Sequence, residues 1–448
     1  MSDVLRVRVV DLTEDGEGIA FGPNGIKIFI KGGYPGDDVE VTLYGIKEKY
    51  AQGKLIRIVS SKISRIQPFC QNQCGSCSYT DLEYRTETAF KESKLLELYA
   101  NTIGKNYDES LYKGFIGMES PFEYRNKAVY AVEKSGDEYK VGLYRRQSHA
   151  IIDIRCCRLE PEWINAARNG IRDILNTAEF RNLTATFERT LRYLFLRGAD
   201  KGEKLAVLVV YCRFPGIDLL TDKLNSLGIN NVLLSVNQDE GNRILGDTMS
   251  VLTGDNTINV ELLNLKFKVN PYSFLQINTE QTAKLYRTAV DLLCLEHDDS
   301  VLDLYCGIGT ISLYMAGMCH KVFGVECVSE AIDNAVENAL ANGISNTDFR
   351  VGLVEKILPQ IIAEGHKVTK AVLDPARKGC APEVFKTLSG AGINTIAYIS
   401  CNPKSQCRDI LIAMQYGYNV KCISAVDMFP HTSHVETVVL LSREKQNG

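Results

Sequence analysis

The chain has 448 residues, of which 45% are hydrophobic and 24% charged, and its formal net charge is −4 at pH 7. This length exceeds one hydrophobic core and predicts two or three domains, and the lack of an apolar run of about 18 residues excludes a membrane span. The negative charge argues against an extended basic surface for nucleic acid, although a local groove can still be basic.

The N-terminus and the cysteines indicate the compartment. "MSDVLRVRVV" has no signal-peptide pattern, because its apolar part is short and interrupted by arginines. We therefore expect a cytoplasmic protein whose thiols are reduced. Its 14 cysteines are then expected to serve metal binding or catalysis rather than disulfides.

Residues 1–62 are expected to form a small closed β-barrel. Short alternating segments such as "RVRVVDL", "GIAFG" and "IKIFIKG" are separated by glycine turns, which is typical of such barrels. Small barrels often bind oligonucleotides, but a fold alone does not establish a function.

Residues 63–265 are expected to form a central α+β domain. It begins with a cysteine-rich segment at 70–77, followed by a helix over about 80–103 that we expect to pack against the C-terminal domain. Runs such as "KAVYAVEK" and "LAVLVVYC" predict strands between helical segments.

Residues 266–448 show repeated strand-then-helix units and predict a doubly wound α/β domain of the Rossmann type. The turn "LDLYCGIGT" places Asp303, Gly307 and Gly309 where the first strand meets a helix, and Glu326 closes the next strand. Glycines at such a turn allow a ligand to approach the backbone closely, and the glutamate can accept both hydroxyls of a ribose.

The ligand of this turn is expected to be S-adenosylmethionine. A dinucleotide-binding loop would carry a third glycine where this chain has Ser312. The Asp303 carboxylate suits the positive sulfonium and amino groups of S-adenosylmethionine better than a diphosphate. A dinucleotide-dependent oxidoreductase is the competing interpretation, and a tight turn capped by Asp303 is the non-functional one.

Three later segments bring reactive groups to the same edge of the sheet. "AVLDPARKG" ends a strand with Asp374, "TIAYISCNP" delivers Cys401 to an exposed turn, and "HVETVVLL" begins the last strand near Glu436. A thiol at a strand-to-helix turn can gain thiolate character from the helix amides. Asp374 could equally be a helix N-cap, and the nearby His431 and His434 are either acid–base groups or polar loop residues.

These groups suit methyl transfer to C5 of a uracil. Carbon 5 is not nucleophilic by itself, but it becomes so once a thiolate adds to C6. A base must then remove the C5 proton so that the thiolate can leave. A cysteine, a carboxylate base and polar groups for the uracil edge are all expected at this sheet edge.

The chain resembles the RNA uracil-C5 methyltransferases, an S-adenosylmethionine-dependent family that makes 5-methyluridine in 23S ribosomal RNA and in the T-loop of tRNA. The resemblance covers nearly the whole chain. In chain order, it is carried by a TRAM-type barrel, "NPYSFLQIN" (270–278), "LDLYCGIGT" (302–310), "LDPARKG" (373–379), "ISCNP" (399–403) and "HVETVVLL" (434–441). One departure is "DPAR", where the family usually has Asp-Pro-Pro-Arg.

The resemblance implies a role for each matching position. Cys401 is similar to the family's nucleophile, and Glu436 to the base that removes the C5 proton. Asp374 lies where the family contacts cofactor and uracil. Together with the glycine turn, the positions expected to bind the cofactor are Gln276, Asp303, Tyr305, Gly307, Gly309, Glu326 and Asp374.

The cysteine-rich segment predicts a [4Fe–4S] cluster. "PFCQNQCGSC" supplies Cys70, Cys74 and Cys77, and "IDIRCCRLE" adds two candidates, of which the resemblance implies Cys157 rather than Cys156. Family members usually have a longer first gap than the three residues here. Tetrahedral zinc is an alternative. The spacing also equals that of radical S-adenosylmethionine enzymes, but this segment follows a β-barrel and has serine before its third cysteine.

We expect RNA as the partner, no membrane contact and a monomeric chain. "VDMFPHT" (426–432) resembles the ribosomal branch most and favours 23S ribosomal RNA over tRNA, with the target base flipped into the crevice. Arg65, Arg125 and Lys127 are candidates for phosphate contacts or solvated surface charges. A non-catalytic RNA-binding or assembly factor remains an alternative, which the presence of Cys401 disfavours.

Overall fold

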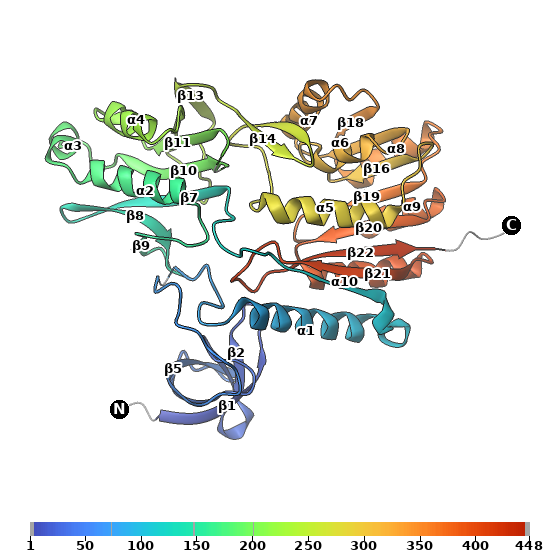
Figure 1. Ribbon diagram of the computed structural model, residues 1–448, viewed down its shortest axis with the longest axis horizontal. Coiled ribbons are helices and arrows are strands. Elements are labelled where there is room, and N and C mark those ends of the chain that lie inside the picture. Colours follow the sequence, from blue (N-terminus) through green and yellow to red (C-terminus); the bar gives the residue numbers. More distant parts are fainter. Residues whose placement is uncertain (1–3, 73, 147, 200, 444–448) are drawn as a thin grey trace.

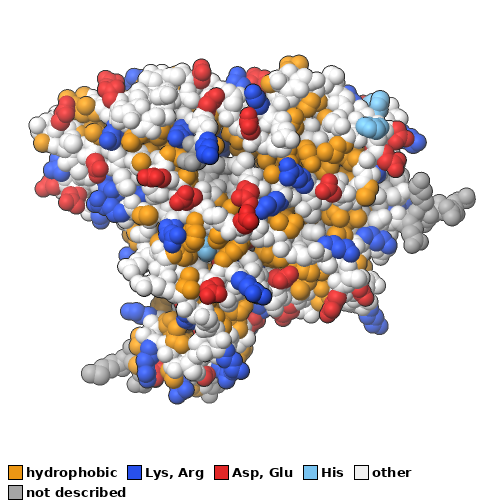
Figure 2. All heavy atoms as spheres, viewed as in Figure 1, with side chains coloured by type: hydrophobic (Ala, Val, Ile, Leu, Met, Phe, Trp, Pro, Cys, Tyr) orange, Lys and Arg blue, Asp and Glu red, His pale blue; other side chains and the backbone are white. Residues whose placement is uncertain are grey.

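The computed structural model describes residues 4–443, apart from residues 73, 147 and 200. A β-barrel, a central α+β region and a C-terminal α/β region follow one another along the chain (Figure 1), which matches the multidomain fold predicted from the sequence. Acidic and basic side chains are interspersed over the face drawn in Figure 2. Within the described ranges, no helix combines the length and apolarity that crossing a membrane requires.

The N-terminal region is a closed barrel of five strands in the order β1-β2-β3-β5-β4. The strands are β1 (Val4–Leu12), β2 (Gly18–Phe21), β3 (Lys27–Ile30), β4 (Asp38–Tyr44) and β5 (Tyr50–Ser60), and a short 3-10 helix covers Pro23–Gly25. Alternate residues point inward. The barrel core consists of Val7, Val9, Ala20, Ile28, Ile30, Val39 and Val41.

A long helix joins the barrel to the C-terminal region. Helix α1 (Tyr84–Ile103) runs along the lower edge of the C-terminal sheet in Figure 1 and packs against α10 (Pro403–Gln415). Leu95, Tyr99 and Ile103 of α1 belong to an apolar cluster shared with that sheet. The end of α1 continues into short 3-10 helices at Gly104–Asn106 and Glu109–Leu111.

The central region is a seven-stranded mixed sheet in the order β13-β12-β11-β10-β7-β8-β9. Its strands are β7 (Lys127–Ser135), β8 (Glu138–Tyr144), β9 (Ile151–Asp153), β10 (Leu191–Gly198), β11 (Lys204–Val210), β12 (Asn231–Val236) and β13 (Thr248–Thr253). Its helices are α2 (Glu162–Leu175), α3 (Ala178–Leu183) and α4 (Ile217–Ser226). These helices cover one face of the sheet through Trp163, Phe180 and Leu220. On the other face, Phe195 and Val207 pack against the hairpin of β14 (Ile258–Leu262) and β15 (Leu265–Val269).

The C-terminal region is an eight-stranded sheet in the order β18-β17-β16-β19-β20-β22-β21-β6. Its strands are β6 (Tyr112–Ile116), β16 (Ser300–Leu304), β17 (Lys321–Glu326), β18 (Thr347–Val351), β19 (Lys370–Leu373), β20 (Thr395–Ser400), β21 (Asn419–Val426) and β22 (Glu436–Ser442). The strands from β16 to β20 are parallel, so their carboxyl ends meet at one edge. Strand β6, which precedes the central region in sequence, is the outermost strand beside β21.

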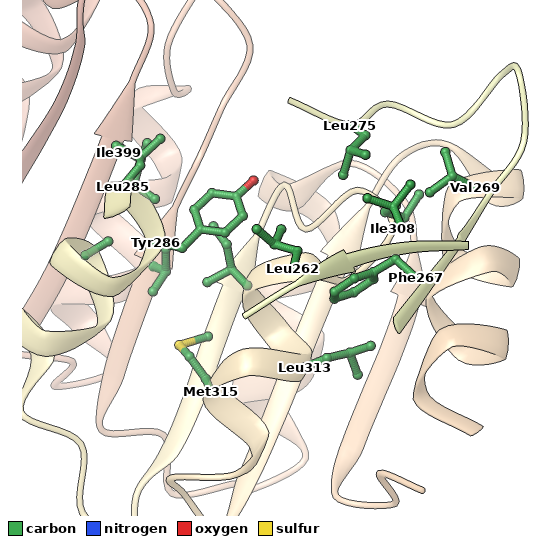
Figure 3. Close-up of a cluster of buried hydrophobic side chains, with 14 of the residues drawn as sticks. Leu262, Phe267, Val269, Leu275, Leu285, Tyr286, Ile308, Leu313, Met315 and Ile399 are labelled. Atoms are coloured by element: carbon green, nitrogen blue, oxygen red, sulfur yellow. The ribbon is translucent and has the colours of Figure 1, made fainter. Parts of the chain in front are cut away.

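Helices cover both faces of this sheet. They are α5 (Thr279–Leu293), α6 (Thr310–Ala316), α7 (Ser329–Ala341), α8 (Val354–Ala363) and α9 (Pro382–Gly390), together with α1 and α10. Alternate strand residues divide between two cores, because Ile399 faces the cluster under α5 and Tyr398 faces the cluster under α10. Figure 3 shows Leu285 of α5 beside Ile399, whereas the ring of Tyr286 extends away from Ile399 toward the middle of the first cluster.

A buried charge cluster fixes α1 to the loop that precedes β22. The Lys91 Nζ atom lies 2.6 Å from Glu87 Oε1 and 2.9 Å from Asp427 Oδ1, and all three side chains are buried. The hydroxyl of Tyr84 also donates to Asp427 at 2.8 Å, and the backbone N–H of His431 donates to Glu87 at 2.6 Å. The position of this loop therefore depends on Lys91 of α1.

We predict that Lys91→Met lowers the melting temperature strongly, because it leaves two buried carboxylates without their cation, at a cost of about 3–5 kcal/mol. Thermal unfolding followed by circular dichroism measures the change. Lys94→Met is the matched control on the same helix, since Lys94 pairs only with partly exposed Asp11 and Glu97 and such pairs contribute about 0–1 kcal/mol. Equal melting temperatures for both variants would contradict the assigned role of Lys91.

Candidate active site

The first strand of the C-terminal sheet ends in a turn that leaves its backbone open to a ligand. Tyr305, Gly307 and Gly309 adopt positive φ angles of 70°, 54° and 80°, a region that glycine occupies at little cost. A side-chain carbon at Gly309 would lie 3.0 Å from the ring of Phe349. Glycine is therefore needed at 309 to pack the turn on its neighbours.

Glu326 lies at the end of β17 beside this turn. Its Oε2 accepts the backbone N–H of Gly307 at 3.3 Å, and its Oε1 accepts the N–H groups of Cys327 and Val328 at 2.7 and 3.0 Å. Backbone amides thus fix the direction of the carboxylate. The Cys327 thiol donates to Oε1 as well, at 3.2 Å, and a ribose hydroxyl is a stronger donor that would displace it.

Asp303 is fully buried under the turn with only one of its oxygens bonded. Its Oδ2 accepts a hydrogen bond from Ser312 Oγ at 2.5 Å, whereas its Oδ1 has no protein partner. Burial raises the pKa of this carboxyl to about 6. A buried, unpartnered carboxylate oxygen is satisfied by a cationic ligand, which fits S-adenosylmethionine. Ser312, where a dinucleotide loop would have glycine, is the bonding partner of Asp303.

Two further carboxyl groups lie at the same sheet edge. Burial and, to a smaller extent, the charge of Asp374 raise the pKa of Glu436 to about 8, against the opposing charge of Arg377. Burial and the charge of Asp303 together raise the pKa of Asp374 to about 7. The charge of Asp303 acts on Asp374, and the charge of Asp374 acts on Glu436, so the three carboxyl groups share one crevice.

Cys401 is half-buried in this crevice. Burial, followed by the charges of Glu436 and Asp374, raises the pKa of its thiol to about 11, and Arg377 opposes these effects. The expected gain of thiolate character from helix amides is therefore wrong. Desolvation and two carboxylates outweigh the amides, and the Asn402 side chain already accepts the first free N–H of α10, from Lys404, at 3.2 Å.

Three residues near the crevice were missed by the sequence interpretation. Arg377, inside the quoted "LDPARKG", is the cation that acts on both Cys401 and Glu436. The hydroxyl of Tyr286 (Figure 3) faces the three carboxyl groups, and burial followed by their charges raises its pKa. Phe274, two residues before Gln276, is 66% exposed. Arg377 and Phe274 could have been found in the motifs, whereas Tyr286 is indistinguishable from a core residue of α5.

The remaining predicted residues divide between the crevice and other places. Gln276 is buried on the loop that precedes α5, where its carbonyl accepts a hydrogen bond from Asn126 at 2.8 Å. His434 lies 3.3 Å from Arg377 through its Nδ1 atom. His431 does not enter the crevice, because its ring is stacked on Phe122 with 4.6 Å between centroids.

The four predicted cluster cysteines are free and gather in one region. The pKa of Cys77 is raised to about 12, chiefly by burial and also by Cys157, Cys74 and Cys70, while Arg125 opposes the shift. Their thiols are thus close enough to interact, and four thiols form a suitable donor set for iron. In the described part of the chain, however, no group of three or more potential ligands is arranged to hold a metal ion. The predicted cluster stays a prediction.

Two family profiles match the sequence. The profile described as tRNA (Uracil-5-)-methyltransferase matches residues 218–444, and the TRAM domain profile matches residues 3–56. The first covers the whole crevice, and the second covers most of the β-barrel.

Similar proteins span the entire chain. A protein of Clostridium tetani named "uncharacterized RNA methyltransferase" is 34% identical over 98% of this chain and 96% of its own. A protein of Clostridium acetobutylicum with the same description is 35% identical over 98% of this chain and 96% of its own. The solved structure of the Pyrococcus abyssi tRNA (uracil-54, C5)-methyltransferase with S-adenosyl-L-homocysteine has a TM-score of 0.75, at 24% identity over 98% of this chain and 100% of its own. That structure shares the fold.

We predict opposite effects of two substitutions on the reactivity of Cys401. Glu436→Gln removes a carboxylate that raises the pKa of the thiol, so the pKa falls and alkylation at alkaline pH becomes faster. Arg377→Met removes the opposing cation, so the pKa rises and alkylation slows. The pH dependence of iodoacetamide modification, followed on the Cys401 peptide by mass spectrometry, measures both. An unchanged midpoint in both variants would show that neither charge acts on the thiol.

Proposed function

The chain belongs to the tRNA (uracil-5-)-methyltransferase family and is an S-adenosylmethionine-dependent RNA methyltransferase of the uracil-C5 type, and on this premise we propose that it makes 5-methyluridine through a covalent adduct of Cys401. The observation that supports this mechanism is the shared crevice of Cys401, Asp374 and Glu436 beside the glycine turn. A thiol, a buried carboxyl and a site for a cationic ligand are the groups that the reaction requires.

The cofactor is proposed to bind across the carboxyl ends of the first two strands. The residues assigned to it are Gln276, Asp303, Tyr305, Gly307, Gly309, Glu326 and Asp374. Asp303 offers its unpartnered oxygen to a positive group, and Glu326 offers lone pairs to the ribose. When bound, S-adenosylmethionine supplies the methyl group that C5 of uracil accepts.

Cys401 and Glu436 are proposed to act in sequence on the uracil ring. The Cys401 thiolate, facing Arg377, forms a bond to C6, and the electron pair of the C5–C6 double bond makes C5 nucleophilic. After C5 has gained its methyl group, the Glu436 carboxylate takes the C5 proton. The electron pair of that C–H bond restores the double bond and expels the Cys401 thiolate. The exposed ring of Phe274 is available to stack on the flipped base.

The substrate is proposed to be 23S ribosomal RNA. This choice is supported by "VDMFPHT" (426–432), which resembles the ribosomal branch of the family. A uridine in the T-loop of tRNA is the second candidate, favoured by the description of the matching family profile.

We predict that RNA carrying 5-fluorouridine traps a covalent adduct with the wild-type protein, because fluorine at C5 cannot be removed as a proton. Cys401→Ala should form no adduct, whereas Cys407→Ala, which removes a buried thiol from α10, the helix that follows Cys401, should retain it. Denaturing gels and peptide mass spectrometry detect the adduct.

Mapping of 5-methyluridine in ribosomal and transfer RNA, with and without the gene, identifies the substrate. An adduct with Cys401→Ala, or retention of every 5-methyluridine in the deletion strain, would refute the assignment.

We also propose that Cys70, Cys74, Cys77 and Cys157 bind a [4Fe–4S] cluster with a structural or RNA-docking role, supported by their four interacting thiols. The protein purified without oxygen should contain iron and acid-labile sulfide. Cys77→Ser should lose both, and Cys156→Ser, its matched control, should keep them. Bound zinc without sulfide would favour the tetrahedral zinc alternative, and a metal-free protein would contradict both.

A further inference from the structure

The structure separates the three cations that the sequence marked as candidates for phosphate contacts. Arg65 is fully engaged within the protein. Its guanidinium forms ion pairs with Asp37 and Asp81, and it lies 4.5 Å from the ring centroid of Tyr34. These contacts hold the barrel to the segment that follows it. Arg65 is therefore a structural residue and is not free for RNA.

Arg125 is also directed toward the protein. The groups that act on its guanidinium are Tyr124, Cys157, Glu160 and Cys77. It lies among the cysteines of the proposed cluster, where its positive charge balances thiols and a carboxylate. A phosphate contact for Arg125 is therefore not supported.

Lys127 differs, because its neighbour is another cation. Lys127 on β7 and Arg197 on β10 are directly paired in the antiparallel register. Burial, followed by the charge of Arg197, lowers the pKa of Lys127 to about 8. Burial alone lowers the pKa of Arg197 to about 10. Among the carboxylates that the structure describes, none contributes to either shift.

An unbalanced pair of this kind destabilises the folded protein. Two positive charges repel each other and lose hydration, and within the part of the chain that the structure describes no negative charge compensates them. Arg197, which is 2% exposed, is held in place by the backbone carbonyls of Asn270 and Ser273 at 2.7 and 2.8 Å. Lys127 is half-buried and accessible. Such a local conflict is typical of a binding site whose ligand brings the missing charge.

The pair lies behind the loop that carries Gln276 and Phe274. The Asn126 side chain, adjacent to Lys127, donates to the carbonyl of Gln276 at 2.8 Å, and Arg197 bonds to the start of the same loop. An anion at Lys127 would therefore lie at the side of the crevice formed by the central region. A flipped nucleotide carries its backbone phosphates with it, and under the proposed function the exposed ring of Phe274 on this loop is available to stack on the base.

We propose that Lys127, reinforced by the buried charge of Arg197, binds a backbone phosphate of the RNA beside the flipped uridine. This inference rests on the proposed function. The carboxylate of the cofactor is another anion that Lys127 could bind. However, Lys127 belongs to the central sheet, whereas the cofactor turn belongs to the C-terminal sheet. On the face drawn in Figure 2, acidic and basic side chains are interspersed, so RNA attraction depends on local cations of this kind.

The test measures binding of unmodified transcripts of 23S ribosomal RNA and of tRNA at several salt concentrations. For the unmodified transcript that the wild-type protein accepts as a substrate, Lys127→Ala should weaken binding several-fold and reduce the slope of log affinity against log salt by about 1, the value for one lost phosphate contact. Lys127→Arg should restore most of the affinity and most of the salt slope. Lys134→Ala, at an exposed lysine of the same strand, is the matched control and should leave both unchanged.

Two further measurements distinguish a phosphate-binding role of Lys127 from a cofactor-binding or a structural role. The affinity for S-adenosylhomocysteine should be unchanged in Lys127→Ala, and the melting temperature of Lys127→Met should equal or exceed that of the wild type, because an uncompensated charge is removed. A weakened S-adenosylhomocysteine affinity with an unchanged salt slope would assign Lys127 to the cofactor and overturn the inference. A lower melting temperature with an unchanged salt slope would overturn it in favour of a structural lysine. Failure of the wild-type protein to methylate either transcript would instead refute the proposed function.

Discussion

Burial of three carboxyl groups at one sheet edge dominates the chemistry of the crevice. Burial is the main cause of the raised pKa of Asp303, Asp374 and Glu436, and repulsion adds to it, because the charge of Asp303 acts on Asp374 and the charge of Asp374 acts on Glu436. The crevice is therefore short of positive charge. A cationic ligand relieves this repulsion, favours the ionised form of Glu436 and lowers the pKa of the Cys401 thiol. Under the proposed function, binding of the cofactor and ionisation of Cys401 and Glu436 are thus coupled through charge.

The crevice is also supported from outside its own sheet. Lys91 of α1 pairs with Asp427, shortly before the strand that begins with Glu436. From the central region, Asn126 and Arg197 hold the loop that carries Gln276. Each support uses a hydrogen bond or ion pair between segments far apart in sequence. The catalytic geometry is therefore a property of the whole chain.

The sequence predicted the order of folded regions and most residues of the crevice, because strand ends and glycine turns are local patterns. It failed where the answer depended on distant neighbours. The thiol of Cys401 was expected to be acidic, but Glu436 and Asp374 lie against it in space. Tyr286 was hidden in an ordinary amphipathic helix, and Arg197 in a strand. Arg65 and Lys127 are indistinguishable in sequence, yet one is neutralised by Asp37 and the other faces a second cation.

Strand β6 has a consequence for how the protein is made. It belongs to the C-terminal sheet, but it is synthesised before the central region, and its partner β21 comes near the end of the chain. The central region is in effect an insertion within the catalytic unit. During translation, the apolar faces of α1 and β6 therefore remain exposed while the central region folds, until the C-terminal sheet has been synthesised. A fragment that starts at residue 266 would lack this edge strand, so the catalytic region cannot be separated by a single cut.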